Sequence, residues 1–495
     1  MIILCKRTLQ IDIRLIISVG SVWKKCRTSM DSKKGTYASP DGSRTWEYLA
    51  IATSAVMAGC LGFVMGWNSP SIVILMADDS PIAVTASAAS TLVAVVALGH
   101  LVGPPLNIFL ADKLGRKVTI LISFSPLIVS WGLITIATSI WELYVARFIA
   151  GFATGLFVCV APMYIGEISS PSTRGAANSL IGIVYNTGIL VTFIVAPYLT
   201  LSFTARVFFV FNVAAVVAFW FMPESPYFLV LRNRMEDAEG VLEKLRGKTD
   251  VSEELQTVID SLSREEKGAA KTGSMSEVFT SRGNFMAFLS ILLFSVTHHF
   301  GGFFTLIIYG QLILKTTSTA ITDYTMNVII GVTQVVASFV TIILVDKLGR
   351  KPLILVSGVL AALSNLVIGV FFYAKDYTSL DLQAYSLAPF IASIVLVFTF
   401  SCGLVCLQII LMSEIFATEV KAVSTCLVGV LGGVQGVVGC KLYIWVAITL
   451  GYGHSLPFLG YFVVVAICTA VIYRITPETK GKTFVEIQKK LNKSS

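Results

Sequence analysis

The hexapeptide DKLGRK at residues 112–117 recurs unchanged at residues 346–351. In each half of the chain it lies between the second and the third long apolar run, and its glycine permits a tight turn between two helices. Identical loops in equivalent places indicate a duplicated bundle. They predict two similar halves related by a pseudo-two-fold axis along the membrane normal, with a solute site between them.

The composition predicts that these helices lie in lipid. Of the 495 residues, 55% are hydrophobic and 13% are charged, whereas a soluble domain has about 25% charged residues. A helix that spans a bilayer needs about 20 mostly apolar residues. We expect twelve such spans, an all-α membrane protein of two six-helix bundles, at residues 48–68, 86–110, 118–138, 141–165, 175–200, 205–222, 285–313, 325–345, 352–373, 386–412, 423–449 and 456–474.

The basic residues predict the orientation. If both termini and the loops on their side are cytosolic, nearly all of the 37 Lys and Arg residues fall on that side. The opposite loops hold only Arg206, Lys315 and Lys375. The net charge of +8 therefore reflects topology, and we expect no nucleic-acid partner. The domains expected are a tail at 1–45, a six-helix bundle at 46–222, a cytosolic linker with short amphipathic helices at 223–283, a second bundle at 284–474 and a tail at 475–495.

No pattern of residues indicates an enzyme or a metal site. The nine cysteines lack ligand spacing, and we find no nucleophile–base pair and no phosphate-binding loop. We therefore expect neither a metal nor a cofactor.

Further motifs follow the helix ends in order. RFIAG stands at 147–151, PMYIGE at 162–167, PESP at 223–226 and PETKG at 477–481. With the repeated hexapeptide they resemble the sugar porters of the major facilitator superfamily, over about residues 46–483. GWNSP at 66–70 and NTGIL at 186–190 are most like the insect facilitated trehalose transporters. The resemblance implies the major facilitator fold, alternating access and a plasma-membrane location.

The same resemblance implies an ion-pair network that closes a gate at the cytosolic helix ends, in which Arg116 and Arg350 join glutamates. A charge inside a bilayer costs about 2.5–3.5 kcal/mol on insertion scales, so it is usually paired or functional. The alternative is structural pairing without gating. The residues of the expected network are Asp112, Arg116, Arg147, Glu167, Arg174, Glu224, Asp346, Arg350 and Glu414.

Sugar hydroxyls need side chains that both donate and accept hydrogen bonds, and aromatic rings pack against the apolar sugar face. The candidates are Asn68, Asn186, His298, His299, Phe304, Tyr309, Gln334 and Gln408, and the alternative for each is a helix-packing role. The pattern departs from the family at several of them. His298 and His299 replace paired glutamines, and Phe304 replaces an asparagine. Helix 10 lacks the usual Pro-x-Pro-Trp element at 406–409, so we expect it to be straighter.

These observations predict a monomeric, facilitative carrier of a sugar, either trehalose or a hexose. Asn68 stands where proton-driven porters often carry an acid, which favours uniport. Two alternatives remain, a carrier of another small polar solute and a sensor or receptor without net flux. Lys441 lies within a span and either extends to the membrane surface or faces the cavity.

Overall fold

A computed structural model describes residues 43–78, 80, 82, 84–269, 275–317, 321–416, 418–480, 486 and 491. Within these ranges the side chains of residues 108, 263–269, 275–277, 346, 413, 418–419 and 421–422 are not described. Nearly all of the predicted N-terminal tail and the side chain of Asp346 therefore lie outside the described part.

Apolar runs form the spans as α-helices, because a backbone in lipid must satisfy its own hydrogen bonds. The first half contains α2 (Thr45–Gly66), α3 (Asn68–Leu75), α4 (Ala86–Leu114), α5 (Arg116–Ile136), α6 (Ile140–Ile168), α7 (Arg174–Val195), η1 (Ala196–Tyr198) and α8 (Leu201–Trp220). Polar residues start several of them. Thr85 caps α4, Thr200 caps α8, and Ser139 forms a capping box with Glu142 at the start of α6.

The second half repeats this order with more interruptions. It contains α13 (Arg282–Phe300), α14 (Phe303–Lys315), α15 (Asp323–Leu348), α16 (Arg350–Tyr377), η2 (Gln383–Tyr385), α17 (Ala388–Thr399), η3 (Phe400–Leu404), α18 (Val405–Glu414), α19 (Thr418–Ile444), η4 (Trp445–Thr449) and α20 (Ser455–Ile475). Twelve segments of the described part are long and apolar enough to cross a membrane. The predicted number of spans and the predicted all-α class are confirmed.

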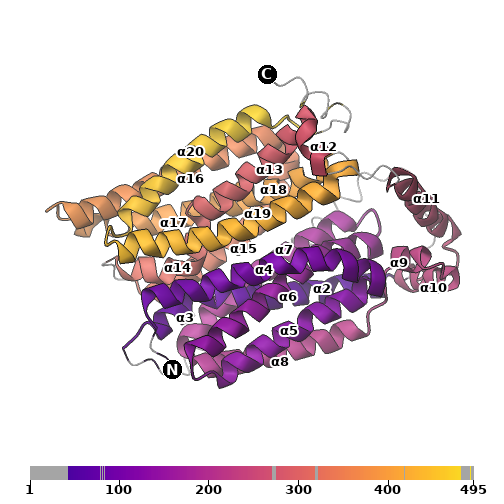
Figure 1. Cartoon of the computed structure of the whole chain (residues 1–495), viewed down its shortest axis with the longest axis horizontal. Helices are drawn as coiled ribbons and strands as arrows, with labels where there is room; N and C mark the ends of the chain where they lie inside the picture. Colours follow the sequence, from indigo (N-terminus) through magenta and orange to yellow (C-terminus); the bar gives the residue numbers. More distant parts are fainter. Residues whose placement is uncertain are drawn as a thin grey trace. The chain divides into compact units, whose positions relative to one another are not determined.

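The halves meet along three pairs of helices. Helix α4 packs on α19, α7 packs on α15, and α3 touches α14. Each half has its own core of buried apolar side chains, and Figure 1 shows the halves as two layers, the first indigo to magenta and the second orange to yellow. The protein is thus two bundles joined along these helix pairs.

The repeated hexapeptide forms the same turn in both halves. Gly115 ends α4 with φ +98°, and Gly349 ends α15 with φ +86°, values that favour glycine. A Cβ atom at Gly115 would also lie 2.9 Å from the ring of Phe228. The tight turn predicted from the sequence is therefore present twice.

Short helices form the linker between the halves. They are α9 (Pro226–Leu231), α10 (Met235–Arg246), α11 (Ser252–Ala269) and α12 (Met275–Thr280). Buried Arg246 ties α10 to the first half, since its Nη1 atom lies 3.0 Å from Oε2 of Glu47 at the start of α2. Figure 1 shows α9, α10 and α11 together at one end of the bundles. We call this end the linker side and the opposite end the far side.

Helix 10 is not regular, although it lacks the family's prolines. A π-helical turn, η3, separates α17 from α18. π-Turns are common causes of kinks in helices. The expectation of a straighter helix 10, which rests on proline alone, stays a prediction.

Candidate functional site

A buried charge cluster lies at the linker side of the first half. Nε of Arg116 is 3.0 Å from Oε2 of Glu167, and the Arg116 side chain is 6% exposed. Nη1 of the same guanidinium donates to the carbonyl oxygen of Ala111 at 3.2 Å. The hydroxyl of Ser225 donates to Oε2 of Glu167. The cluster connects α5, at the hexapeptide, with the end of α6 and the start of the linker.

The second half carries the same cluster. Nη2 of Arg350 is 2.7 Å from Oε1 of Glu414, and Nη1 donates to the carbonyl oxygen of Val345 at 3.4 Å. Thr479 takes the place of the serine, and its hydroxyl donates to Oε2 of Glu414 at 2.6 Å. The predicted pairs Arg116–Glu167 and Arg350–Glu414 are thus brought together, each within its own half.

A second glutamate in each half binds backbone instead of arginine side chains. Glu224 accepts the N–H of Lys117 at 2.9 Å, and Glu478 accepts the N–H groups of Arg350 at 3.1 Å and Lys351 at 2.9 Å. A carboxylate at a helix N-terminus is stabilised by the helix dipole. In this conformation the recorded bonds of Glu224 cap α5, so its place in an ion-pair network stays a prediction.

Partial burial alone would raise the pKa of Glu478. The backbone N–H groups of Lys351, Arg350 and Lys480, together with the Arg350 charge, outweigh this effect and hold the pKa below the usual value for glutamate. Glu478 therefore carries its charge at neutral pH.

Other members of the predicted network contribute less. Asp112 is 67% exposed and lies 3.7 Å from Arg116. Arg174 is exposed, and no ion pair is recorded for it in the described part. None of the recorded ion pairs of the predicted gate residues crosses from one half to the other. The recorded ion pairs of the predicted gate residues therefore form two separate clusters in this conformation.

Arg147 lies apart from both clusters. It is fully buried in the far-side part of α6, and its Nη2 atom donates to Oδ1 of Asn68 at 2.7 Å and to the carbonyl oxygen of Val64 at 3.0 Å. The guanidinium carbon stands 4.7 Å from the centre of the Trp67 ring. The placement of Arg147 in the linker-side network is therefore corrected, because its recorded bonds are to helix 1.

Asn68 is held by this arginine. Its Nδ2 atom donates to the carbonyl oxygen of Met65 at 3.0 Å while its Oδ1 atom accepts from Arg147. Both ends of the amide have partners within the protein. In this conformation Asn68 acts in packing at the break between α2 and α3.

Three of the predicted solute residues lie together at the break in helix 7. The His299 ring is 4.9 Å from that of His298 and 5.1 Å from that of Phe304. Nδ1 of His299 lies 2.9 Å from the carbonyl oxygen of Ser295. The side-chain hydroxyl of Ser295 donates to Oε1 of Gln435 in α19 at 2.7 Å. The group thus combines aromatic faces with hydrogen-bonding atoms, which suits a sugar.

The other solute candidates are spread over several helices. Asn186 of α7 donates to the hydroxyl of Ser338 on α15 at 2.8 Å, and Oε1 of nearby Gln334 is buried without a partner in the described part. Tyr309 stacks on Tyr443 at 5.1 Å. Gln408 is half-buried, with no side-chain hydrogen bond recorded in the described part. The structure therefore brings together only part of the predicted set.

Hydrogen bonds join the halves on the far side. Ser69 of α3 accepts the N–H of Gln311 at 3.2 Å and donates to Asn327 at 3.4 Å. Lys441 of α19 donates to the hydroxyl of Thr91 on α4 at 2.5 Å. Lys441 thus bridges the two halves near the far-side start of α4, and whether it faces the cavity or extends to the membrane surface stays a prediction.

Several of these residues escaped the sequence analysis. Ser225 and Thr479 each follow a Pro-Glu pair, so a second internal repeat was available as a signal. Gln435 is a polar residue in a glycine-rich apolar run.

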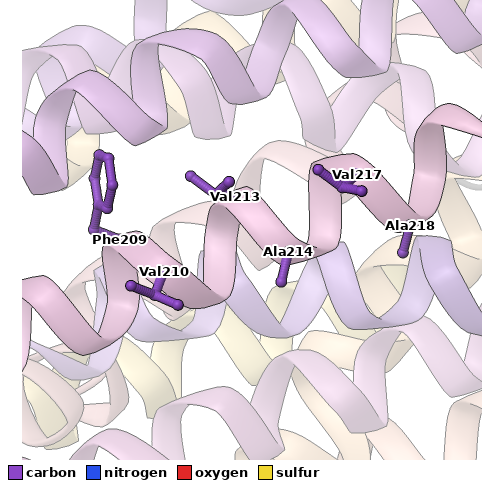
Figure 2. Close-up of a pocket in the computed structure, with 6 residues that line it drawn as sticks. All are labelled: Phe209, Val210, Val213, Ala214, Val217 and Ala218. Carbon is purple, nitrogen blue, oxygen red and sulfur yellow. The ribbon is translucent and has the colours of Figure 1, made fainter.

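A shallow groove on α8 contrasts with this polar region. It has a volume of about 440 Å³ and is lined by Phe209, Val210, Val213, Ala214, Val217 and Ala218. Figure 2 shows these six side chains along one helix, all of them apolar. Such a surface suits lipid and offers no hydrogen bonds to a sugar. No group of three or more potential metal ligands occurs within the described ranges.

The family model of the sugar (and other) transporters matches residues 24–491. The facilitated trehalose transporter Tret1 of Apis mellifera ligustica is 27% identical over 448 residues, covering 90% of this chain and 88% of the relative. Its counterpart in Bombyx mori is 28% identical, covering 97% and 94%.

Solved structures agree on the fold. The inward open xylose transporter XylE from E. coli matches with a TM-score of 0.74 at 19% identity, covering 90% of this chain and 99% of that one. Its partially occluded inward open conformation matches with a TM-score of 0.72 at 20% identity, covering 89% and 100%. From its repeat, its helix order and the extent of these matches, the chain is an integral multi-pass membrane protein that belongs to the sugar transporter family.

Proposed function

We propose that the chain is a facilitative carrier that moves a sugar, trehalose or a hexose, through the membrane by alternating access. One observation carries the proposal. Hydrogen bonds from Ser69 and Lys441 join the halves on the far side, while the charge clusters on the linker side stay within their own halves. This asymmetry fits one of two states of a carrier, the state that is closed on the far side. The names of the relatives, facilitated trehalose transporters, support the substrate class.

In the opposite state the linker side closes. Arg116 and Arg350 lie at the linker-side ends of equivalent helices, so approach of the halves brings each near acceptors of the other cluster. The seams along α4–α19 and α7–α15 then act as the lines about which the halves rock. A solute between His299, Gln435 and Gln334 would face one side and then the other.

The proposal places both termini and the linker side in the cytosol, and the protein in the plasma membrane as a monomer. The excess of Lys and Arg in the loops on the linker side supports this orientation.

Uptake by proteoliposomes containing the purified protein tests the substrate. We expect labelled trehalose or a hexose to equilibrate with the lumen, and His299→Phe to slow uptake about tenfold, the loss of about one hydrogen bond to the solute. Val213→Leu on the lipid-facing groove of α8 is the matched control and should keep the wild-type rate. Solute binding without flux would favour a sensor, and uptake of another polar solute in place of sugars would favour the alternative carrier.

A second experiment tests uniport. Buried Arg147 is bound to the neutral amide of Asn68, so helix 1 offers no carboxylate there to carry a proton. We expect wild-type uptake in oocytes to proceed without external alkalinisation or a substrate-induced current. A proton current that saturates with substrate would contradict uniport while leaving sugar transport intact.

A further inference from the structure

Helix 7 is interrupted by two consecutive glycines. Its first part, α13, ends at Phe300, and its second part, α14, begins at Phe303. Between them Gly302 has φ +85°, a left-handed value that favours glycine. A Cβ atom at Gly301 would lie 2.7 Å from the ring of Phe400, so a side chain does not fit there either. This turn is therefore the place where the two parts of helix 7 can change their angle.

The two parts of helix 7 have different neighbours. Helix α13 packs on α19 and α20 of its own half, whereas α14 also packs on α3 of the first half. The N–H of Gln311 in α14 donates to the hydroxyl of Ser69 in α3 at 3.2 Å. Ile72 of α3 is 1% exposed and packs in the apolar core cluster of the second half. Opening of the far side therefore requires α14 to move away from α3.

One buried side chain of helix 9 binds the turn directly. Asn365 of α16 is 0% exposed, and its Nδ2 atom donates to the carbonyl oxygen of Gly301 at 2.9 Å. In an uninterrupted helix this carbonyl would accept the N–H group four residues later. The break frees the acceptor at membrane depth, where an unsatisfied backbone group is costly. The amide of Asn365 thus supplies the donor that the broken helix lacks.

A tyrosine of helix 12 holds the turn from another side. The hydroxyl groups of Tyr461 in α20 and Thr305 in the first turn of α14 are 3.0 Å apart. The ring also packs against the turn, because a Cβ atom at Gly302 would lie 3.2 Å from Cδ2 of Tyr461. Helices α16 and α20 pack along each other. The bonds to the turn and to α14 therefore come from one packed pair of helices.

We propose that Asn365 and Tyr461 are positioning residues that fix the turn of helix 7 and thereby hold the far side closed. The inference rests on the alternating access proposed above and names the support of its far-side contact. Loss of the bond to Gly301 leaves a buried carbonyl oxygen without its donor, which destabilises this conformation relative to one in which α14 has left α3. If α14 instead moved with its half as a rigid body, the turn would stay the same and the bond would favour neither state.

The first half supplies a matched control. Asn212 of α8 is also 0% exposed, and its Nδ2 atom donates to the carbonyl oxygen of Phe208 one turn earlier at 2.7 Å. Asn365 makes the same kind of bond to Ala361, so its recorded bonds differ by the one to Gly301. Helix α8 packs on α2 and α5. Asn212→Ala therefore removes an equally buried amide that does not bind helix 7.

Thiol labelling at residue 72 of the purified full-length protein tests the proposal. Ile72→Cys places a thiol that is covered while α14 packs on α3, and mass spectrometry of its peptide separates it from the nine native cysteines. In this background we expect N365A to raise the rate of maleimide labelling about tenfold, because a buried carbonyl loses its donor. A purely structural role would lower the transition temperature without changing this rate, which is the result expected of N212A.

Tyr461→Phe tests the same turn while keeping the ring. It removes one hydroxyl group, and we expect the labelling rate to rise about threefold. If N365A does not fold, Y461F decides in its place. A labelling rate in N365A equal to that of the parent I72C protein, or an equal rise in N212A, would overturn the proposal. The labelling needs no solute, so the expected pattern without sugar flux would end the carrier proposal and leave the turn as a hinge.

Discussion

Replacing Gly151 with valine is expected to destabilise the fold so strongly that little folded protein reaches the membrane. Gly151 of α6 lies directly against α4, and a Cβ atom there would come within 2.8 Å of the carbonyl carbon of Val96. A neighbouring contact is as close, because a Cβ atom at Gly103 would lie 2.6 Å from the backbone of Gly155. Both obstacles are backbone atoms, which cannot move aside as a side chain can. We expect a destabilisation of at least about 3 kcal/mol, the upper end of ordinary overpacking.

Surface expression and the thermal transition of detergent-extracted protein measure this effect. Gly166→Val is the matched control, since it makes the same change on the same helix where a Cβ atom meets nothing within 4 Å. The control should express and unfold like the wild type. A Gly151→Val protein with a wild-type transition temperature would show that α4 and α6 do not pack this closely.

Glu167→Gln is expected to be the most damaging single change among the gate charges. The side chains of Arg116 and Glu167 are 6% and 13% exposed, whereas those of Arg350 and Glu414 are 13% and 26% exposed. Removing one partner of a buried pair leaves the other charge uncompensated, at a cost of about 3–5 kcal/mol. We expect Glu414→Gln to cost less, because its arginine is better hydrated.

The measurements are thermal unfolding, net uptake and equilibrium exchange at matched surface expression. Asp112→Asn serves as the control, since this exposed pair is worth about 1 kcal/mol or less. If both glutamine variants show normal exchange and normal net flux, the clusters are structural and do not gate transport. If stability falls in both but flux per folded molecule is unchanged, the same conclusion holds.

The fold was predictable because its signals were local and repeated. The two copies of the hexapeptide located equivalent turns, and the apolar runs gave helix lengths that only lipid explains. Arg116 and Arg350 were placed correctly because each begins a helix directly after the turn. Their partners Glu167 and Glu414 followed from the ends of other helices on the same side.

The position of a charged residue along its helix, and the group to which it binds, were not predictable in the same way. Arg147 occurs in a helix of 29 residues, and its charge suggested a carboxylate partner. Its recorded side-chain partner is instead the neutral amide of Asn68, far away in sequence. The bonds of Glu224 were not predictable for a related reason. The sequence does not distinguish a carboxylate that accepts from backbone N–H groups from one that binds arginine.

The solute region shows the same limit. The sequence marks His299 as a departure from the family pattern, but it gives no signal for Gln435. The partner of Gln435 is Ser295, one turn before His299. Helix 11 has no periodic signal that separates a glutamine facing the cavity from one facing another helix. Such contacts depend on how two distant segments are rotated, which single-sequence patterns do not encode.

The π turn η3 determines how the two parts of helix 10, α17 and α18, are rotated relative to each other. Such a turn holds one residue more than an α turn, so its conversion to regular α-helix would turn everything after it by about 100°. Glu414 ends α18, the segment that would be turned, while Phe400 at the start of η3 stacks on Phe303 beside the histidines at 5.4 Å. A change in this turn would therefore rotate Glu414 relative to Arg350 while the helix between them stays continuous. A single extra residue in mid-helix thus lies between the Phe303–Phe400 stack and the Arg350–Glu414 pair.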